Sequence, residues 1–248
     1  MILLPLGVGS AFTKNYYHSN FLIDIKGTRL LIDAGTTIRY SLLSADIDPV
    51  SIDSIFITHF HHDHVGGLAE FLLLCYWQFK EGRHIPHRPV LYLRPSQLTE
   101  IAGLLSPALN NQGLCWQDYC IPKLIKNDLV AVDNFTMQII STDNLHCEGL
   151  KSCGVKIFDS SLQNIILSGD IKNLDDSQLL SFIDCNTTAV IQDLSFSNNF
   201  VHSTYEEVLK YYPKNLQDKI FGTHYDDRIE PDNKFPIKLL RQGVPLQF

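Results

Sequence analysis

Residues 58–68 read Thr58-His59-Phe60-His61-His62-Asp63-His64-Val65-Gly66-Gly67-Leu68. The stretch follows a predicted strand at 54–58 and precedes an apolar pattern of helical spacing at 65–80. A tight loop between the two can direct four ligand-type side chains toward one point: His59, His61, Asp63 and His64. Imidazole nitrogens and carboxylate oxygens suit zinc, manganese or iron. Because the motif is internal and chemically mixed, it differs from an affinity tag, and it favours a pair of metal ions.

Further ligand candidates stand at the ends of other predicted strands. His146 follows a strand of the second half, Asp170 follows the run 165–169, and His224 follows the run 220–223. Any one of them alone is more often a satisfied polar residue. Together they add two histidines and one carboxylate, and a carboxylate can bridge two cations. The combined set is large enough for a two-metal site.

Short apolar or alternating runs dominate both halves of the chain, and helical patterns separate some of them. Strands are predicted at 2–6, 21–25, 29–32, 54–58, 90–93, 129–132, 136–141, 154–158, 164–167, 189–192 and 219–222. Helices are predicted at 65–80, from about 95, at 176–183 and at 203–211. We therefore expect two packed sheets with helices outside, an α+β fold of four layers in the order αββα. A single domain over residues 1–248 is expected, with a helical insertion around 78–120.

The composition narrows the function classes. The chain has 248 residues, of which 45% are hydrophobic and 19% charged, so it can bury a sizeable core and is not globally disordered. Its net charge of −7 argues against a general nucleic-acid coat protein. The opening MILLPLGVGS does not resemble a secretory signal, no apolar run is long enough to span a membrane, and the six cysteines form no CxxC pair. We expect a cytoplasmic protein with no membrane partner.

With these motifs in this order, the chain resembles the metallo-β-lactamase-fold hydrolases from Leu4 to about Arg228. Leu30–Gly35 resembles the first family motif, and residues 59–64 complete the HxHxDH motif. The resemblance implies two divalent cofactor ions, zinc first and manganese as the alternative, and it implies that Asp33 orders the ligand loop from outside. The implied ligands are His59, His61 and His146 on one metal, Asp63, His64 and His224 on the other, and Asp170 as the bridge.

Several stretches separate the branches of this family. Asn144–Gly149 stands where glyoxalase-type members carry Gly-His-Thr-Pro-Gly-His, which disfavours a thioester hydrolase. The opening Leu6–Phe12 resembles the phosphodiesterase branch, which includes transfer-RNA 3′-end nucleases, and Val201–Thr204 resembles its His-Ser-Thr motif. Asp193, within Ile191–Ser195, stands where those nucleases carry the glutamate of a His-Glu-Ala-Thr motif. Asp193 thus keeps the carboxylate of that motif, but this chain lacks the histidine that precedes the glutamate in those nucleases.

A closer resemblance is to the anti-Pycsar phosphodiesterases, phage and bacterial enzymes that open cyclic nucleotides. The shared features are the compact length, the opening Gly9–Tyr17, Asn20 and the helix start His64–Phe71. The implied activity is hydrolysis of 3′,5′-cyclic CMP and UMP, with cyclic AMP and GMP as further substrates, to nucleoside monophosphates, counteracting antiphage signalling. A transfer-RNA 3′-end endonuclease is the alternative, and RNA is a partner only in that case. A non-catalytic nucleotide-binding protein is the alternative of another class, and a broken ligand set would be its signature.

The resemblance also implies catalytic roles beside the metals. His202 is the expected acid for the leaving ribose oxygen, because an imidazole titrates near neutral pH. Asp193 would orient this ring and raise its pKa. Asp63 would double as metal ligand and base. A helix cap at 203–204, with a capping box through Glu206, is predicted in either case.

Substrate contacts are expected from the polar loop before the second predicted strand. Asn20 and Tyr17 are the predicted contacts, whereas His18 is interpreted as part of a turn. One or two aromatic rings are expected to stack on the base, from Tyr16, Tyr17, Tyr76, Trp77, Trp116 and Tyr119. Because members of the resembled family are commonly dimers, we expect a homodimer.

Overall fold

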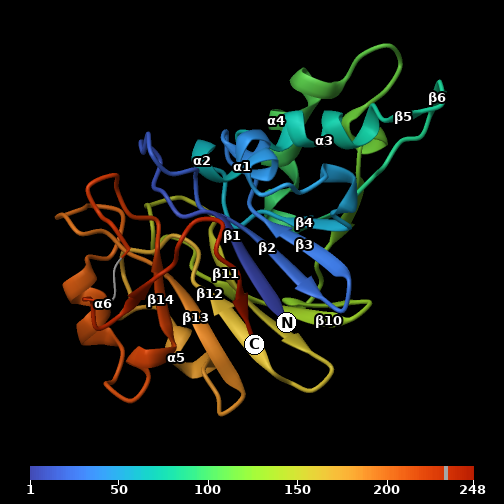
Figure 1. Cartoon of the computed structure of the whole chain (residues 1–248). Coiled ribbons are helices and arrows are strands. Elements are labelled where there is room, and N and C mark those ends of the chain that lie inside the picture. The colour runs from blue at the N-terminus through green and yellow to red at the C-terminus, as the bar shows by residue number, and fades with distance from the viewer. Residues whose placement is uncertain (232–233) are drawn as a thin grey trace.

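The computed structural model describes residues 1–231 and 234–248. Two sheets pack face to face, and each has seven strands within the described residues (Figure 1). The first sheet has the order β16-β1-β2-β3-β4-β7-β8. Its strands are β1 (Ile2–Gly7), β2 (Asn20–Ile25), β3 (Thr28–Ile32), β4 (Ser54–Phe56), β7 (Val90–Leu93), β8 (Ile121–Leu124) and β16 (Leu246–Gln247).

The second sheet has the order β15-β14-β13-β12-β11-β10-β9. Its strands are β9 (Leu129–Val132), β10 (Phe135–Ser141), β11 (Cys153–Asp159), β12 (Asn164–Leu167), β13 (Thr187–Asp193), β14 (Ile220–Thr223) and β15 (Lys238–Leu239). From β9 to β12 the pairing is antiparallel, and from β12 to β15 it is parallel. The carboxyl ends of β12, β13 and β14 therefore meet at one edge of the sheet.

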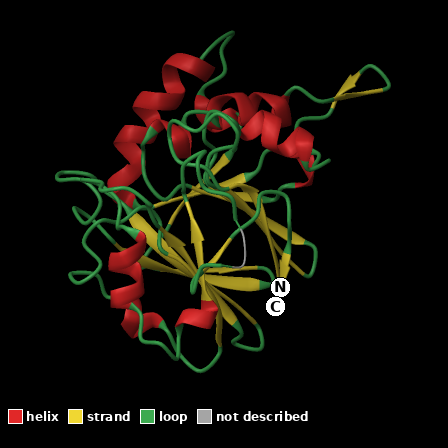
Figure 2. Ribbon diagram, turned by 60° about the vertical axis from the view of Figure 1, so that its left-hand side comes forward, coloured by secondary structure: helices red, strands yellow, loops and turns green. Residues whose placement is uncertain are grey.

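Helices cover the outer face of each sheet and complete four layers, as Figures 1 and 2 show. The helices on the first sheet are α1 (Ile38–Ser44), α3 (Leu68–Tyr76) and α4 (Leu98–Leu109), and those on the second are α5 (Leu179–Phe182) and α6 (Tyr205–Tyr211). The short α2 (His62–Val65) lies within the ligand loop, and single 3₁₀ turns occur at Pro49–Ser51, Pro95–Gln97, Trp116–Asp118 and Gln217–Lys219. Among the described residues, no helix has the length and apolar content needed to cross a bilayer.

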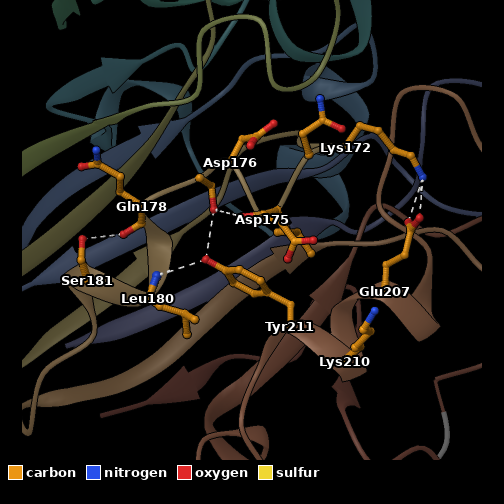
Figure 3. A pocket seen from close by; sticks show the side chains of 12 residues that line it. Lys172, Asp175, Asp176, Gln178, Leu180, Ser181, Glu207, Lys210 and Tyr211 are labelled. Atoms are coloured by element: carbon orange, nitrogen blue, oxygen red, sulfur yellow. Dashed lines mark hydrogen bonds and ion pairs between the residues drawn. The ribbon is translucent and has the colours of Figure 1, made fainter.

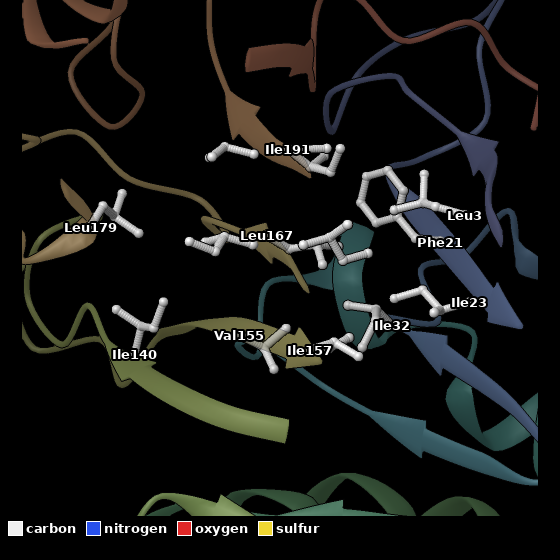
Figure 4. Packing of buried hydrophobic residues seen from close by; sticks show 14 of the residues in the cluster. Leu3, Phe21, Ile23, Ile32, Ile140, Val155, Ile157, Leu167, Leu179 and Ile191 are labelled. Atoms are coloured by element: carbon white, nitrogen blue, oxygen red, sulfur yellow. The ribbon is translucent and has the colours of Figure 1, made fainter. Parts of the chain in front are cut away.

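The strands at the centre of the first sheet are buried on both faces. Phe21, Ile23 and Ile32 point into the core between the sheets, where Figure 4 shows them facing residues of the second sheet. Leu22 and Leu31 point the other way, into a second core beneath the helices. Full burial of such a side chain contributes roughly 1.5–3 kcal/mol. Burial on both faces explains why these strands are apolar at consecutive positions.

The helix predicted over 65–80 is divided by two glycines. α2 ends at Val65, and α3 begins at Leu68 and ends at Tyr76, earlier than predicted. The Gly67 amide donates to the Ala34 carbonyl at 2.9 Å. A Cβ at Gly67 would lie 2.3 Å from the Gly35 carbonyl oxygen, so the two backbones approach too closely for any other residue.

The segment 78–120, expected to be an insertion, contributes to the first sheet. It contains the two-stranded hairpin of β5 (Phe79–Lys80) and β6 (Arg83–His84), which projects from the body in Figures 1 and 2. It also contains β7, which pairs with β4 and β8, and α4, whose apolar face joins the core beneath the helices. Helix α1 and strand β8 were not predicted from the sequence.

The capping box of α6 uses a different pair from the one predicted. Thr204 is the cap: its hydroxyl accepts from the Glu207 amide at 3.2 Å, and the Glu207 carboxylate accepts from the Thr204 amide at 2.7 Å. The predicted box through Glu206 is therefore wrong. The Ser203 hydroxyl instead donates to the Ile171 carbonyl at 2.9 Å, which ties the start of α6 to the segment after Asp170.

The close packing under the ligand loop predicts a specific stability effect. A Cβ at Gly35 would lie 1.9 Å from the Asp63 carbonyl oxygen, whereas a Cβ at Gly103 in α4 would meet nothing within 4 Å. We expect Gly35→Ala to lower the free energy of unfolding by about 1–3 kcal/mol through overpacking. Gly103→Ala should raise it by up to about 1 kcal/mol, because alanine is the better helix former. Urea unfolding at fixed zinc concentration measures both, and equal effects of the two substitutions would contradict this account.

Candidate metal centre

Asp33, directly after β3, anchors the ligand loop. Its carboxylate accepts from the Thr58 amide at 2.7 Å and from the Thr58 hydroxyl at 2.8 Å. One of its oxygens also lies 2.8 Å from Nδ1 of His64. With Nδ1 engaged in this way, Nε2 of His64 is the ring atom left for a ligand. Asp33 has a positive φ of 64°, so its backbone conformation is one that most residues avoid.

The first group of ligands joins the two halves of the chain. His59 and His61 come from the loop after β4, and His146 comes from the loop after β10; their ligand atoms lie within 4.8 Å of one another. Nε2 of His146 is 3.0 Å from Nδ1 of His61. The other ring nitrogen of His146 lies 2.6 Å from the Val201 carbonyl, which fixes the ring orientation.

The second group is fully buried. Asp63, His64, Asp170 and His224 place their ligand atoms within 4.8 Å of one another. Asp63 lies 3.2 Å from Nε2 of His224 and 3.4 Å from Nε2 of His64. Asp170, after β12, lies 3.2 Å from Nε2 of His64.

Asp170 lies between the two groups. The same oxygen of Asp170, Oδ2, is 3.9 Å from Nε2 of His59 and 3.8 Å from Nε2 of His146, which belong to the first group. It is also 3.4 Å from Nε2 of His224, which belongs to the second. The structure thus brings all seven predicted ligands together, with Asp170 at the shared position.

The chemistry of this donor set fits divalent cations. Nε2 of His59 and Nε2 of His64 are buried, and neither has a hydrogen-bond partner among the described residues. Burial lowers the pKa of His59 well below its ordinary value, so this ring is neutral and offers a lone pair. Burial opposes protonation of His64 as well, but Asp170 and Asp33 raise its pKa well above the ordinary value. Carboxylates that favour a proton at this position also favour a divalent cation there.

His202 forms a pair with Asp193 at the edge of the cluster. Its Nδ1 lies 2.9 Å from Asp193 at the end of β13, and the same Asp193 oxygen accepts from the Ile171 amide at 2.9 Å. Although burial disfavours the charged ring, Asp193 raises the pKa of His202 to about 9. His202 also lies 3.8 Å from Asp170, so it adjoins the ligand set.

The two predicted substrate contacts, Asn20 and Tyr17, differ in their burial and in their hydrogen bonds. Asn20 is fully buried; its amide donates to the His18 carbonyl at 2.5 Å and accepts from the Gly35 amide at 2.9 Å. Both ends of this side chain are therefore used within the chain, in support of the ligand loop. Tyr17 is half-buried. It lines neither of the two wider cavities that border the cluster, which are described below. His18, interpreted from the sequence as part of a turn, does line one of them.

Most of the aromatic candidates are engaged elsewhere. Trp116 and Tyr119 are buried in the core beneath the helices. Tyr76 and Trp77 pack against His84 of the β5–β6 hairpin. Tyr16 packs edge-on against the Tyr225 ring at 5.2 Å.

An ion pair that was not predicted holds the His146 loop. The Arg94 guanidinium, after β7, donates to both carboxylate oxygens of Asp143 at 2.9 and 3.0 Å and to the Ser152 carbonyl at 3.0 Å. Burial opposes ionisation of Asp143, but Arg94 lowers the pKa of Asp143 below its ordinary value. Bidentate pairs of this kind fix geometry strongly. No short sequence motif predicts the ion pair of Arg94 and Asp143, because the two residues are far apart in the sequence.

The two wider cavities beside the cluster share part of their lining. One of about 410 Å³ is lined by Ala11, Phe12, His18, Thr36, His61, His62, Asp63, His146, Asp170, Val201 and His202. The other, of about 230 Å³, shares Phe12 and His202 with it. A wider cavity of about 1050 Å³ lies between α6 and the segment 172–181 (Figure 3). Its lining contains no histidine, and the Lys172–Glu207 ion pair closes one side of it.

Comparison with known sequences identifies the family. The profile described as "Anti-Pycsar protein Apyc1" matches residues 1–244. The chain belongs to the anti-Pycsar protein Apyc1 family. An Apyc1 protein of Bacillus phage BSP38 is 31% identical over 238 residues, which cover 91% of this chain and 89% of that protein. The resemblance inferred from the opening residues is thereby confirmed.

Solved structures confirm the fold of this Apyc1-family chain. The metallo-β-lactamase-fold protein YhfI from Bacillus subtilis aligns with a TM-score of 0.75 at 14% identity, covering 99% of each chain. A diphosphatase from the PhnP family aligns with a TM-score of 0.74 at 16% identity, covering 100% of this chain and 97% of that one. The expected αββα sandwich is the metallo-β-lactamase fold.

The contacts of Asp33 predict its effect on metal binding. Asp33→Asn keeps the size of the side chain but replaces an acceptor of the Thr58 and His64 hydrogen bonds by a donor. We expect zinc affinity to fall roughly 10- to 100-fold, as for other residues that orient metal ligands. Competition with a chromophoric chelator measures this. Asp159→Asn, at the far end of β11, is the matched control, and equal zinc affinity in both variants would refute the role of Asp33.

Proposed function

We propose that this chain is a two-metal phosphodiesterase that opens 3′,5′-cyclic nucleotides to nucleoside monophosphates and so counteracts Pycsar signalling. The observation that carries the proposal is the position of His202. This histidine, paired with Asp193, borders a cavity of about 410 Å³ together with four of the seven candidate ligands. A volume in the range of about 300–1,000 Å³ is usual for small-molecule sites. The Apyc1 family name supports the substrate class.

The proposed cofactors are two divalent cations, zinc first and manganese as the alternative. The mixed nitrogen and oxygen donors of the cluster suit both metals. When bound, such a pair would supply a water molecule of lowered pKa and would neutralise charge on the phosphate. His59, His61 and His146 would hold one cation, and Asp63, His64 and His224 the other, with Asp170 shared.

The side chains around the cluster would carry the proton transfers. His202 would donate a proton to the leaving ribose oxygen. Asp193 holds Nδ1 of this ring, which leaves Nε2 as the donating atom. Asp63, which lines the same cavity, is proposed both as a metal ligand and as the acceptor of the proton from the attacking water.

The role of His202 as the acid predicts that its effect depends on the leaving group. We expect His202→Ala to lower kcat for cyclic CMP roughly 100-fold or more, the range usual for a general acid. With a p-nitrophenyl phosphodiester the loss should be much smaller, because p-nitrophenolate leaves without a proton. Kinetics on zinc-loaded protein, with metal content measured in parallel, test this. A loss below about tenfold on cyclic CMP would rule out the role.

The substrate class predicts a clear preference. We expect zinc-loaded protein to convert 3′,5′-cyclic CMP, UMP, AMP or GMP to nucleoside monophosphates, and to leave a 3′-extended transfer-RNA precursor largely intact. Chromatography of the products measures both reactions. Cleavage of the RNA alone would make the chain a processing endonuclease. Tight binding of cyclic nucleotides without turnover would make it a non-catalytic binding protein.

The assembly is part of the same proposal. We propose that the chain acts in the cytoplasm as a homodimer. The proposal of a dimer rests on the resemblance to a family whose members are commonly dimers. The mass from light scattering at micromolar concentration tests the dimer, and the mass of a single chain would reject it.

A further inference from the structure

One large apolar side chain beside the candidate metal centre, Phe12, belongs to neither hydrophobic core. The Phe12 ring is 93% exposed, although it lies in a loop that borders the buried cluster of candidate ligands. An isolated exposed apolar residue is common on protein surfaces. Phe12 differs because, among the described residues, it and His202 alone line both the cavity of about 410 Å³ and the cavity of about 230 Å³.

The loop that carries Phe12 is anchored on its C-terminal side. Asp227 accepts from the Lys14 amide at 2.8 Å and from the Asn15 amide at 2.9 Å. The Tyr16 hydroxyl donates to the Ile229 carbonyl at 2.8 Å. The loop is also held before its tip, where the Ser10 amide donates to the Tyr225 carbonyl at 3.2 Å. Because the backbone of the loop is held on both sides of Phe12, a ligand that binds the ring would order little more of the backbone.

The walls of the larger cavity divide into two chemical types. Imidazole and carboxylate groups, among them His61, Asp63 and Asp170, line one part. Ala11, Phe12 and Val201 supply the apolar part. A ligand that fills both parts needs a charged end for the cluster and a flat apolar end for the ring. Nucleotides have this combination, because a phosphate and an aromatic base are joined through ribose.

We propose that Phe12 is the platform on which the nucleobase stacks, and that it sets the affinity for nucleotides over phosphodiesters without a base. This inference rests on the proposed function and names the residue that recognises the substrate. A phenyl ring has no hydrogen-bonding group, so it stacks on purine and pyrimidine rings alike. Discrimination between bases is therefore expected to be weak at this contact. The proposal replaces the tyrosines and tryptophans suggested by the sequence, most of which pack within the chain.

The test compares substrates with and without a base. Wild type, Phe12→Ala and Phe12→Trp are assayed, zinc-loaded, on cyclic AMP, cyclic CMP and a ribose 3,5-cyclic phosphate that lacks the base. Phe200→Ala is the matched control: this ring is 99% exposed and lies two residues before His202, but it lines neither cavity. Binding of nucleoside 5′-monophosphates by calorimetry gives a second readout that does not depend on turnover.

We expect Phe12→Ala to raise KM for both cyclic nucleotides, and Kd for the monophosphates, roughly 5- to 100-fold, the range for loss of one base–aromatic stack. The abasic substrate should change less than about twofold, kcat should be retained, and Phe12→Trp should restore affinity. Phe200→Ala should match wild type.

Three outcomes would overturn the assignment. These are equal losses on the abasic and base-bearing substrates, no change in any Phe12 variant, or a changed particle mass by light scattering, which would mark Phe12 as a contact between chains. If the wild type opens no cyclic nucleotide, the proposed function fails instead. Calorimetry with the monophosphates then still decides whether Phe12 binds the base.

Discussion

A single carboxylate oxygen, Oδ2 of Asp170, lies within 3.9 Å of ring nitrogens of five histidines, and the site is arranged around it. Burial raises the pKa of this carboxyl group, but the surrounding rings, His224 first, lower it well below its ordinary value. A buried charge costs several kcal/mol unless opposite charge and hydrogen bonds compensate it. Without a metal ion, protonated rings such as His64 and His202 supply part of that charge, because nearby carboxylates raise the pKa of both. A cation between Asp170 and the rings would compensate the cluster and so link its stability to metal binding.

The fold holds these groups at the ends of strands from both sheets. The loop after β4 brings His59 to His64, and β12 and β14 end just before Asp170 and His224. The supporting contacts come from residues outside the cluster. Asp33 fixes the His64 ring, and Arg94 holds the loop of His146 through Asp143. Because the supports come from well-packed strand ends, the site is built on the rigid part of the molecule.

The ligands and most of the strands were predictable because their signals are local. The HxHxDH motif lies in one loop, and the apolar runs of β2 and β3 indicate strands by composition alone. The close approach of Gly67 to the Gly35 backbone was not predictable, because the two residues lie in separate segments of the sequence. Asn20 was predicted to contact the substrate because of its residue type. Its burial could not be predicted, because it depends on the packing of β2 beside the Gly35 turn. Its amide joins the His18 and Gly35 backbones instead.

The packing of most aromatic candidates was not predictable for a similar reason. Composition identifies rings but not their exposure, and Trp116 and Tyr119 are buried by helices that the sequence placed only coarsely. From the sequence, the opening Leu6–Phe12 was used only as a family resemblance, and residue type alone does not set Phe12 apart from the other rings. Its significance comes from the two cavities that it lines, where the opening loop meets the segment around His202.

The backbone conformation of Asp33 and His224 limits which residues can stand at these two positions of the site. Asp33 and His224 have φ angles of 64° and 67°, in the left-handed region. Glycine and asparagine adopt this region at a lower energetic cost. Local backbone stability and the side-chain chemistry thus favour different residues at the same positions. At Asp33 the carboxylate offsets the backbone cost, because it accepts from the Thr58 amide and hydroxyl and pairs with His64. Glycine would relax the backbone there but leave those buried groups without a partner, so the same contacts that order the ligand loop also keep an unfavourable φ angle in the folded chain.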